Sequence, residues 1–389
     1  MKHIKLALPL LLAAAYAPQA WANPFVGSDL QNLTVFGATY VTTGANSTVF
    51  GNVSTGDVGT NGANGTITGN MSSVNAWNTG AISIVGGNAN SGGVTTSGAG
   101  AVIGGNLTSS GAATIGAGAI VKGNMVAGGV TTTGDSAKVL GYVQSGGTAS
   151  IGANSVILGN VAAMGAVTVG TLGSVGSQSV LGGSPVGPAW QAGLQSAAAA
   201  DAKLVTSTQS YLNGLGSGNL LAATMTTSTT LNPGVYSAAS LSLTAGITLT
   251  FDAHGLDNQS WVFNLTNILV TGASVNMVLI NAGLNDSVYW NSGGYAAVGA
   301  GNAFKGIVLA KDYVSVGANA YVTNVNSNNS CGGVFSATSY VSTGDSAVIG
   351  GSGCMSSVQV APVPEPESYA LTLAGLMSIG FISRRRKLS

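Results

Sequence analysis

The sequence of 389 residues predicts an all-β fold. We expect a β-solenoid, or β-helix, with about 18 residues per coil, three short sides to each coil and one long α-helix packed alongside. Sixty glycines accompany a hydrophobic fraction of 45% and a charged fraction of only 6%, which is typical of β architectures with many tight turns. An 18-residue period runs without gaps through the first half, and one central segment has helical spacing.

Glycine marks the 18-residue period most clearly. One column of glycines precedes Asn in every repeat except the one that has Tyr142: Gly51, Gly69, Gly87, Gly105, Gly123, Gly141 and Gly159. β-Branched aliphatic residues stand two positions before these glycines and other apolar residues two positions after, which predicts short strands with one face inward. A second glycine column runs from Gly44 to Gly170, and the two columns predict two tight corners with positive φ. About eight coils fit between residues 36 and 180, and their stacked Asn residues can form ladders.

The repeat region, residues 23–187, is followed by a predicted helix over residues 188–216. Pro188 suits a helix start and Gly216 a helix end. The residues expected on its packed face are Trp190, Leu194, Ala197, Leu204, Tyr211 and Leu215. The other face is too polar for the helix to cross a membrane, so we expect it to lie along one face of the solenoid. Corner motifs return at irregular spacing over residues 217–356, which predicts that the same solenoid resumes with longer insertions.

The N-terminal segment, residues 1–22, has the order of features of a secretory signal peptide. Lys2 and Lys5 form a basic start, an apolar stretch follows, and Ala20 and Ala22 flank a small-residue cleavage site. We therefore expect cleavage by signal peptidase and export of the chain.

The C-terminal segment, residues 357–389, has three parts. Pro364, Glu365 and Pro366 form a short motif, an apolar run covers 369–382, and a basic cluster follows with Arg384, Arg385 and Arg386. This tail resembles the PEP-CTERM sorting signal of Gram-negative bacteria that make exopolysaccharide. The resemblance implies processing by an exosortase, only transient membrane contact through the C-terminal helix, and passage through the periplasm to the cell surface or the medium.

The second half carries a series of segments that is similar to the ice-binding-like family, also called the DUF3494 type. In chain order these segments are 231–236 (LNPGVY), 249–253 (LTFDA), 261–264 (WVFN), 278–281 (VLIN), 288–290 (VYW) and 304–310 (FKGIVLA). Residues 33–37 (LTVFG) are similar to the family's opening strand. The resemblance implies a β-helix of triangular section with one helix alongside, in a family that includes secreted proteins that adsorb to ice. The 18-residue array is a departure, because it makes the part before the helix longer than is usual in the family.

One column of the repeat consists almost entirely of hydroxyl residues. Its members are Thr42, Thr60, Asn78, Thr96, Thr114, Thr132, Ser150 and Thr168. Threonine presents a hydroxyl and a methyl group on a stiff side chain, so an outward column could order water and adsorb to ice. An inward ladder beside a glycine corner is the alternative, which we weigh more heavily because a corner shifts the alternation. If the column faces outward, Thr43, Thr95, Thr131 and Thr133 would widen the patch.

The remaining side chains favour a protein that is not an enzyme and has no cofactor or metal. The balance of 11 basic and 11 acidic residues argues against nucleic acid as a partner. His254 has no neighbour in the sequence that predicts a catalytic relay, and we expect a polar loop residue there. Asp135 and Asp345 occupy Gly-Asp corner motifs and are expected to serve the turns.

Three further features bear on partners and stability. Cys331 and Cys354 are the only cysteines, and outside the cytosol they are expected to form a disulfide. Trp77 stands in a column of smaller residues, so we expect it to be exposed as a candidate for polysaccharide contact, whereas Trp261 and Trp290 are expected to pack in the core. The sequence therefore predicts an ice-binding protein or, alternatively, a non-enzymatic matrix or adhesive protein that binds exopolysaccharide.

Overall fold

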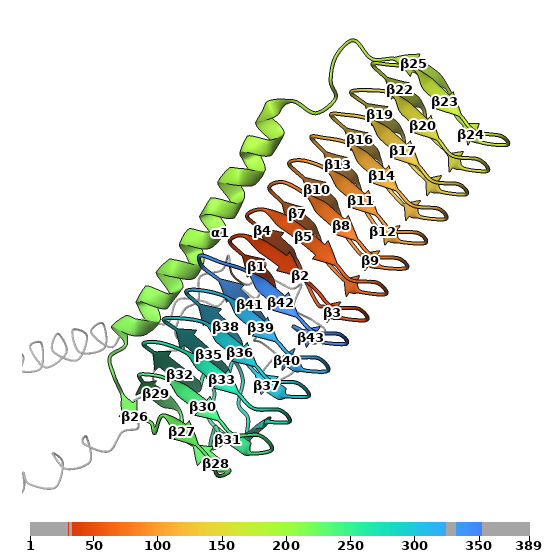
Figure 1. Ribbon diagram of the computed structural model, residues 1–389. Helices are drawn as coiled ribbons and strands as arrows, with labels where there is room; N and C mark the ends of the chain where they lie inside the picture. Colours follow the sequence, from red (N-terminus) through yellow and green to blue (C-terminus); the bar gives the residue numbers. More distant parts are fainter. Residues whose placement is uncertain (1–29, 31–32, 324–331, 352–389) are drawn as a thin grey trace, which may run out of the picture. The chain divides into compact units, whose positions relative to one another are not determined.

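The computed structural model describes residues 30, 33–323 and 332–351, and these residues form a stack of coils with one helix along its side (Figure 1). The predicted signal peptide, the sorting tail and both cysteines lie outside the described residues. The β-solenoid with a flanking helix is thus confirmed, whereas the targeting segments and the disulfide stay predictions.

Three parallel sheets form the walls of the solenoid, and each coil adds one short strand to each sheet. Sheet A has 15 strands: β1 (Val35–Gly37), β4 (Val53–Thr55), β7 (Met71–Ser73), β10 (Ala89–Ser91), β13 (Leu107–Ser109), β16 (Met125–Ala127), β19 (Val143–Ser145), β22 (Val161–Ala163), β25 (Gln178–Val180), β26 (Asn219–Leu220), β29 (Gly234–Ala238), β32 (Ser260–Leu265), β35 (Ser287–Ser292), β38 (Ile307–Ala310) and β41 (Gly333–Ser336). Sheet B has 14 strands: β2 (Tyr40–Thr42), β5 (Val58–Asn61), β8 (Trp77–Thr79), β11 (Thr95–Ser97), β14 (Ala113–Ile115), β17 (Thr131–Thr133), β20 (Ala149–Ile151), β23 (Val167–Val169), β27 (Thr224–Met225), β30 (Leu241–Leu243), β33 (Leu269–Thr271), β36 (Ala296–Val298), β39 (Val314–Val316) and β42 (Val341–Thr343). Sheet C also has 14 strands: β3 (Thr48–Val49), β6 (Thr66–Ile67), β9 (Ile84–Val85), β12 (Val102–Ile103), β15 (Ile120–Val121), β18 (Lys138–Val139), β21 (Val156–Ile157), β24 (Ser174–Val175), β28 (Thr229–Leu231), β31 (Thr248–Asp252), β34 (Asn276–Ile280), β37 (Ala303–Lys305), β40 (Tyr321–Thr323) and β43 (Val348–Ile349).

The 18-residue period is the register of the sheets. Val35 pairs with Val53, and each later coil up to β24 repeats this step. The aliphatic column of the sequence forms one buried file in the interior of sheet C: Val49, Ile67, Val85, Ile103, Val121, Val139 and Ile157. Because successive coils lie about 4.8 Å apart, side chains at equivalent positions stack directly on one another in the interior.

The chain does not build the stack in sequence order. The first coil, β1 to β3, pairs with the last coil, β41 to β43, so that Val41 lies beside Val341 and Thr48 beside Val348. From this junction the N-terminal coils extend in one direction, and the C-terminal coils occupy the other side (Figure 1). The prediction of one resuming solenoid is confirmed, and the structure adds that the two halves meet in the middle.

Several C-terminal coils are longer than 18 residues, which explains their irregular spacing. Asn264 and Asn291, on neighbouring coils, are 27 residues apart, whereas equivalent residues of the N-terminal array are 18 apart. Large aromatic side chains fill their interior, and the rings of Phe263 and Trp290 stack with centroids 4.0 Å apart. Trp261 and Trp290 are buried, as predicted.

The glycine columns have a different cause from the one predicted. Only Gly51 in the Gly-Asn column has positive φ, and none in the column from Gly44 to Gly170 does. The positive φ angles occur instead in the column that contains Asn46, Asn64 and Gly100. Glycine is required because coils approach closely: a Cβ on Gly62 would lie 2.4 Å from the carbonyl oxygen of Gly44. Both glycine columns therefore allow the backbone to stack rather than to turn.

The Gly-Asn pairs form the predicted ladder, with a specific geometry. The Asn52 Oδ1 atom accepts a hydrogen bond of 2.7 Å from the backbone N–H of Asn70, and the same contact repeats along the array. That oxygen occupies the space that a Cβ on Gly69 would need, at 2.3 Å. Glycine and asparagine are therefore paired because the glycine of one coil makes room for the amide of the coil below.

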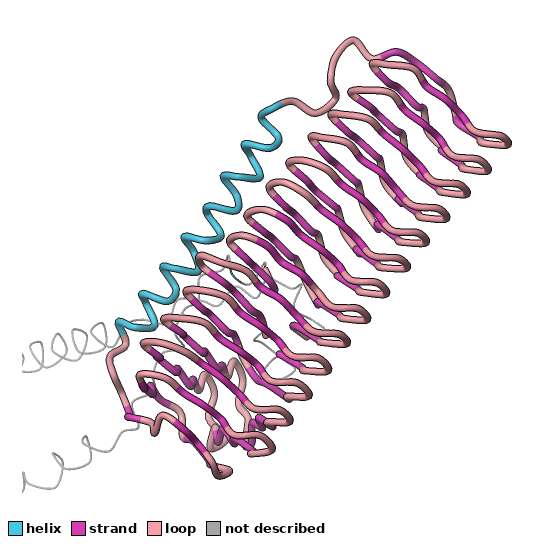
Figure 2. Tube along the Cα trace, viewed as in Figure 1, coloured by secondary structure: helices cyan, strands magenta, loops and turns pink. Residues whose placement is uncertain are grey.

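The helix α1 (Pro188–Gly214) runs along sheet A and returns the chain toward the far end of the stack (Figure 2). Its predicted position is confirmed, and its predicted packed face is right only in part: Leu204 and Leu215 pack against the solenoid, but they lie at the margin of the contact. Tyr211 is 45% exposed and Ala197 is exposed, whereas Ala198, Val205 and Leu212 are buried. The centre of the packed face follows Ala198, Val205 and Leu212, each one residue after a member of the predicted face.

Polar contacts explain the orientation of α1. Asn291 donates from Nδ2 to the carbonyl oxygen of Gln209 at 3.2 Å, and Asn264 donates to that of Leu212 at 2.6 Å. Ser54 donates to the carboxylate of Asp201 at 2.7 Å. Apolar periodicity missed this face because the helix docks partly through polar groups. Within the part of the chain that the structure describes, no helix is both long enough and apolar enough to span a membrane.

Candidate functional site

The hydroxyl column lies on the outer face of sheet B. In β11, Thr96 is exposed while Thr95 and Ser97, on either side of it, are buried. The other N-terminal strands of the sheet show the same alternation, with Thr42, Ser150 and Thr168 exposed and the remaining members partly exposed. The structure therefore assigns the outward orientation, and the inward alternative is wrong.

The outward column continues across the junction into the C-terminal half. Thr42 pairs with Ser342 on one side and with Thr60 on the other. Beyond Ser342 the C-terminal members, in spatial order, are Ser315, Ala297, Val270, Ser242 and Thr224. We call the whole file, from Thr224 to Thr168, the hydroxyl file. It crosses all 14 strands of sheet B in one register.

The threonines expected to widen the patch face the interior instead. Thr43, Thr95, Thr131 and Thr133 are all buried. The Oγ1 atoms of Thr95 and Thr131 have no hydrogen-bond partner among the described residues. Strand alternation accounts for this, because neighbours in a strand point to opposite faces.

A second outward file runs beside the hydroxyl file, two residues earlier in each strand. Its N-terminal members are mainly small or β-branched: Val58, Ala76, Val94, Ala112, Val130, Thr148 and Ala166. At the junction four tyrosines stack along the same line, with ring centroids 4.5 Å apart for Tyr40 and Tyr340, 5.0 Å for Tyr340 and Tyr313, and 4.7 Å for Tyr313 and Tyr295. We call these residues the tyrosine ladder. Burial, and secondarily the neighbouring tyrosines, raise the pKa of Tyr313, so its phenol stays neutral.

The outer face of sheet B has no charged residue within its strands, and no described element packs over it. None of its strands contains a charged residue, whereas sheet C carries Lys138, Lys305 and Asp252 in its strands. The helix α1 packs on sheet A, against strands that include β1, β32 and β41. Sheet B therefore presents a regular array of methyl and hydroxyl groups with no charged side chain in its strands.

Trp77 does not contribute to this surface. It is 0% exposed and lies in the inward column of sheet B, beneath Thr95. The prediction of an exposed tryptophan for polysaccharide contact is therefore wrong. The residue fits because the neighbouring coil has Gly59 at the facing position, where a Cβ would lie 2.5 Å from the indole.

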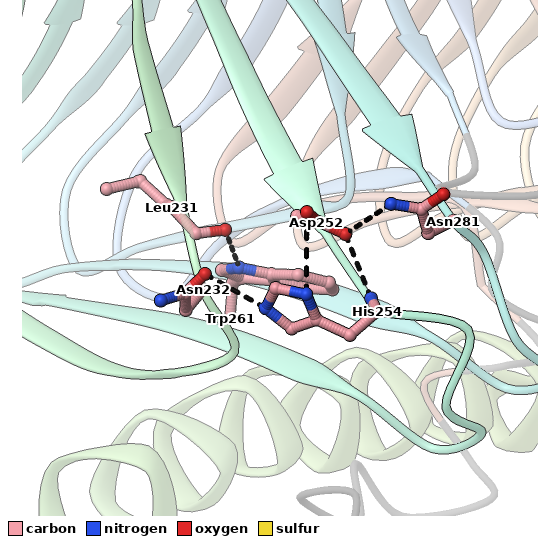
Figure 3. A network of polar contacts seen from close by, with 6 residues as sticks. All are labelled: Leu231, Asn232, Asp252, His254, Trp261 and Asn281. Atoms are coloured by element: carbon pink, nitrogen blue, oxygen red, sulfur yellow. Dashed lines mark hydrogen bonds and ion pairs between the residues drawn. The ribbon is translucent and has the colours of Figure 1, made fainter.

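A polar cluster surrounds His254 at the end of β31 (Figure 3). His254 Nδ1 lies 3.5 Å from Asp252 Oδ2, and its Nε2 lies 3.0 Å from Asn232 Oδ1. Asn281 and the backbone N–H of His254 donate to Asp252, which holds the pKa of that carboxylate below its usual range. His254 is an exposed loop residue, as predicted, but it has a carboxylate partner that the sequence interpretation overlooked. The six residues of Figure 3 include no serine, cysteine or lysine nucleophile, and the contacts tie neighbouring coils together.

The corner aspartates serve the turns, as predicted. Asp135 accepts a hydrogen bond of 2.8 Å from the backbone N–H of Ala153, and Asp345 accepts one of 2.9 Å from Ala45. Each carboxylate therefore caps the corner of the neighbouring coil. Within the described residues, no three His, Cys, Asp or Glu side chains gather as a metal site would require.

Comparison with known proteins finds similarity in the second half of the chain. Residues 177–349 match the family model described as Ice-binding-like. The match includes α1 and the C-terminal coils and leaves out most of the 18-residue array. It agrees with the resemblance seen in segments 231–310.

Individual relatives carry names that refer to ice. The chain is 33% identical over 159 residues to an ice-binding protein of Nostoc sp. (strain HG1), which covers 40% of this chain and 55% of that protein. It is 36% identical over 96 residues to Ice-binding protein 1 of Shewanella frigidimarina (strain NCIMB 400), covering 24% of this chain and 11% of that one. The chain thus spans about half the length of the Nostoc relative.

Solved structures of ice-binding proteins are also similar. The crystal structure from the Antarctic ascomycete Antarctomyces psychrotrophicus has 20% identity and a TM-score of 0.33, covering 63% of this chain and 92% of that one. The structure from an Antarctic bacterium of the Flavobacteriaceae has 16% identity and a TM-score of 0.33, covering 84% and 98%.

Proposed function

We propose that this protein adsorbs to ice through the outer face of sheet B, without enzymatic activity. The hydroxyl file carries the proposal: it crosses all 14 strands in register, faces outward and has no charged neighbour in the sheet. The match to the Ice-binding-like family and the relatives named for ice binding support it.

The chemistry of adsorption follows from the two side-chain groups of threonine. Its methyl and hydroxyl are held on a β-branched side chain with few rotamers, and parallel strands repeat them at about 4.8 Å along the stack. The second outward file adds methyl groups from Val94 and Val130 at the same repeat. Water next to such a surface is positioned by evenly spaced hydroxyls rather than organised around ions.

Rigidity is the second requirement, and the coil interior supplies it. The Asn ladder links each coil to the next, and the buried aliphatic file fills the space between the sheets. A surface that is ordered before binding loses little conformational entropy on adsorption. Many weak contacts can then add up over the length of the file.

A pair of lysine substitutions tests the proposed face. Thr114 on sheet B and Thr66 on sheet C are both outward-facing and both partly exposed. Thr114→Lys should abolish most of the thermal hysteresis and of the inhibition of ice recrystallisation, because a hydrated ammonium group interrupts the file. Thr66→Lys adds the same charge to another face and should leave both activities unchanged. Equal loss in the two variants, or no loss in either, would refute the assignment of the face.

If the wild-type chain has no ice activity at any concentration, binding to exopolysaccharide is the alternative that remains. A pull-down with the polysaccharide of the producing strain would then decide it. The buried positions of Trp77, Trp261 and Trp290 remove these tryptophans as sugar contacts, which leaves the tyrosine ladder as the aromatic surface on sheet B.

We also propose that the chain is exported and sorted. The signal-peptide features of residues 1–22 and the PEP-CTERM features of residues 357–389 support this. In a bacterium that has an exosortase, the mature protein should lack both segments by mass spectrometry. Replacing Pro364 and Glu365 by Ala should leave the C-terminal segment in place, so the mature variant should be heavier than the mature wild type. Loss of the C-terminal segment from the variant as well would contradict the sorting proposal.

A further inference from the structure

The two ends of the solenoid are open edges of all three sheets. One end consists of β25, β23 and β24, and the other consists of β26, β27 and β28. Each of these strands pairs on one side only among the described residues. We call them the β23–β25 end and the β26–β28 end.

Interior side chains are exposed at both ends. Val180 continues the buried column of Ala127, Ser145 and Ala163, yet it is 82% exposed. Val167 is also only partly buried, whereas the residues below it in its column are fully covered.

The β26–β28 end shows the same feature. Met225 and Leu221 are partly exposed although they pack on the core. Leu220, which pairs with the outward-facing Ser237, adds apolar surface beside them and is 84% exposed. Both ends thus display apolar surface that an additional coil would cover.

In the part of the chain that the structure describes, neither end has the usual protection of a free strand edge. Natural sheets avoid edge pairing with charged residues, proline or covering segments. The sequence contains no charged residue between Lys138 and Asp201, which includes the whole β23–β25 end, and none between Lys203 and Asp252, which includes the β26–β28 end. The six edge strands contain no proline.

Within residues 33–323 and 332–351, no segment covers either end. The connection to α1 descends along the side of the stack, since Ser184 Oγ would lie 3.0 Å from a Cβ on Gly146 and the carbonyl of Val186 3.3 Å from one on Gly128. The first and last strands in the sequence, β1 and β43, lie at the junction in the middle of the stack. Figure 1 shows both ends free of any other labelled element.

The molecule already contains a join of the kind that these ends could make. At the junction, β41 to β43 meet β1 to β3 although the paired residues are about 300 positions apart in the sequence, as in the contact of Asp345 with Ala45. All three sheets continue through the join, with Val49 beside Ile349 in the core. Stacking of this kind therefore needs no covalent connection between successive coils.

We infer that the protein associates head to tail with further copies of itself, the β23–β25 end of one copy stacking on the β26–β28 end of the next. The strands are parallel throughout, so the edge of β23–β25 matches the edge of β26–β28 as that of β41–β43 matches that of β1–β3. β25 would pair with β26, β23 with β27 and β24 with β28 of the next copy. Such a heterologous join does not close, so it produces open filaments.

Assembly would extend the functional face, although the inference does not rest on ice adsorption. Thr168 of one copy would stand next to Thr224 of the following copy, so the hydroxyl file would continue from molecule to molecule. The bound area per particle would grow with filament length.

Two end variants of the full chain test the inference by sedimentation velocity over a concentration series. Val180→Lys places an ammonium group in the core column of one end, and Met225→Lys does the same at the other. Ile82→Lys is the control, because Ile82 is exposed at a corner in the middle of the stack. Circular dichroism and thermal unfolding verify the fold of each variant. Should Met225→Lys not fold, Leu221→Lys replaces it, because Leu221 also packs against the core at this end.

The expected pattern is specific to a head-to-tail join. The wild type and Ile82→Lys should form larger species as concentration rises, with filaments visible by electron microscopy. Each end variant alone should stay monomeric, while their equimolar mixture should form dimers and nothing larger, because only one compatible pair of ends remains. A wild type that stays monomeric would overturn the inference. So would dimers of a single end variant, which indicate a symmetric join, or association unchanged by both variants, which indicates another surface such as the C-terminal segment.

Discussion

Thr131 and Thr132 are neighbours in β17 whose side chains point to opposite faces of sheet B. Thr131 is 0% exposed, lies between Ala113 and Ala149, and its Oγ1 has no partner among the described residues. Valine has the same shape and replaces the hydroxyl by a methyl group. Since an unpaired buried hydroxyl costs about 1–3 kcal/mol, Thr131→Val should raise the free energy of unfolding by about 1 kcal/mol. Thr132 is only partly buried, so Thr132→Val should change it by less than about 0.5 kcal/mol.

Urea denaturation followed by circular dichroism measures both variants against the wild type. The stability of a solenoid is a sum of coil and interface terms, so the transition that includes β17 is the one to compare. Thermal hysteresis provides the second readout. Thr131→Val should leave it unchanged, whereas Thr132→Val should lower it, because this substitution removes a hydroxyl from the outer face. The reasoning is refuted if Thr131→Val destabilises the protein, or if the two substitutions stabilise it equally.

Three further predictions concern coil stacking, helix docking and pH. Gly105→Ala puts a Cβ 2.4 Å from Asn88 Oδ1 and should lower the free energy of unfolding by about 2 kcal/mol. Gly193→Ala in α1 is the control, because a Cβ there meets nothing within 4 Å and should be neutral or stabilising. Equal effects of the two substitutions would contradict the close-approach explanation. Asn291→Ala removes buried hydrogen bonds to α1 and should lower the free energy of unfolding, measured by urea denaturation, by about 2 kcal/mol. The helix α1 should also become more sensitive to proteolysis. Unchanged cleavage of α1 would argue against polar docking. Burial raises the pKa of Asp201 above its ordinary value of 3.8 despite a hydrogen bond from a serine, so the folded state retains this proton longer than the unfolded state does. The contribution of Asp201 to stability is present below pH 3.8 and is lost as the pH rises through the raised pKa. Asp201→Asn should therefore reduce the dependence of the free energy of unfolding on pH and be the more stable form at neutral pH. Parallel plots of unfolding free energy against pH for the two proteins would contradict this.

The 18-residue repeat was enough to predict the coil, because it records local chemistry. Strand alternation places Ile67, Ile103 and Ile157 at equivalent positions, and an apolar file at a fixed period has to be buried together. The start of α1 at Pro188 follows from local chemistry too. These features depend on residues that are close in the sequence or repeat exactly along it.

The explanation of the glycines could not be read from the sequence in the same way. A glycine that permits positive φ and one that makes room for a neighbouring backbone look identical as letters. The distinction for Gly62 and Gly69 depends on atoms of the coil below, including the amide oxygen of Asn52. The repeated Gly-Asn pair was nevertheless a usable signal of stacked coils. Each asparagine amide needs a glycine at the equivalent position of the next coil, so the two residues recur together.

The orientation of the candidate face was decided by tertiary structure. Alternation separates Thr131 from Thr132 but does not say which of them faces the interior, because each corner resets the phase between one strand and the next. Which side chains are buried depends on how the three sheets enclose the interior. The packed face of α1 depends on polar partners such as Asn291, which lies about 80 residues away in the sequence.

The sequence by itself determined the coil, its period, its apolar interior and the presence of a flanking helix. Only the tertiary structure decided that the first coil stacks on the last, that the hydroxyl file faces outward across both halves, and that the stack has two open ends. The physical reason is the range of the interactions: strand periodicity and helix starts are set by neighbours along the chain. Stacking order and exposure are set by backbone edges and side chains that meet only after the chain has doubled back along its helix.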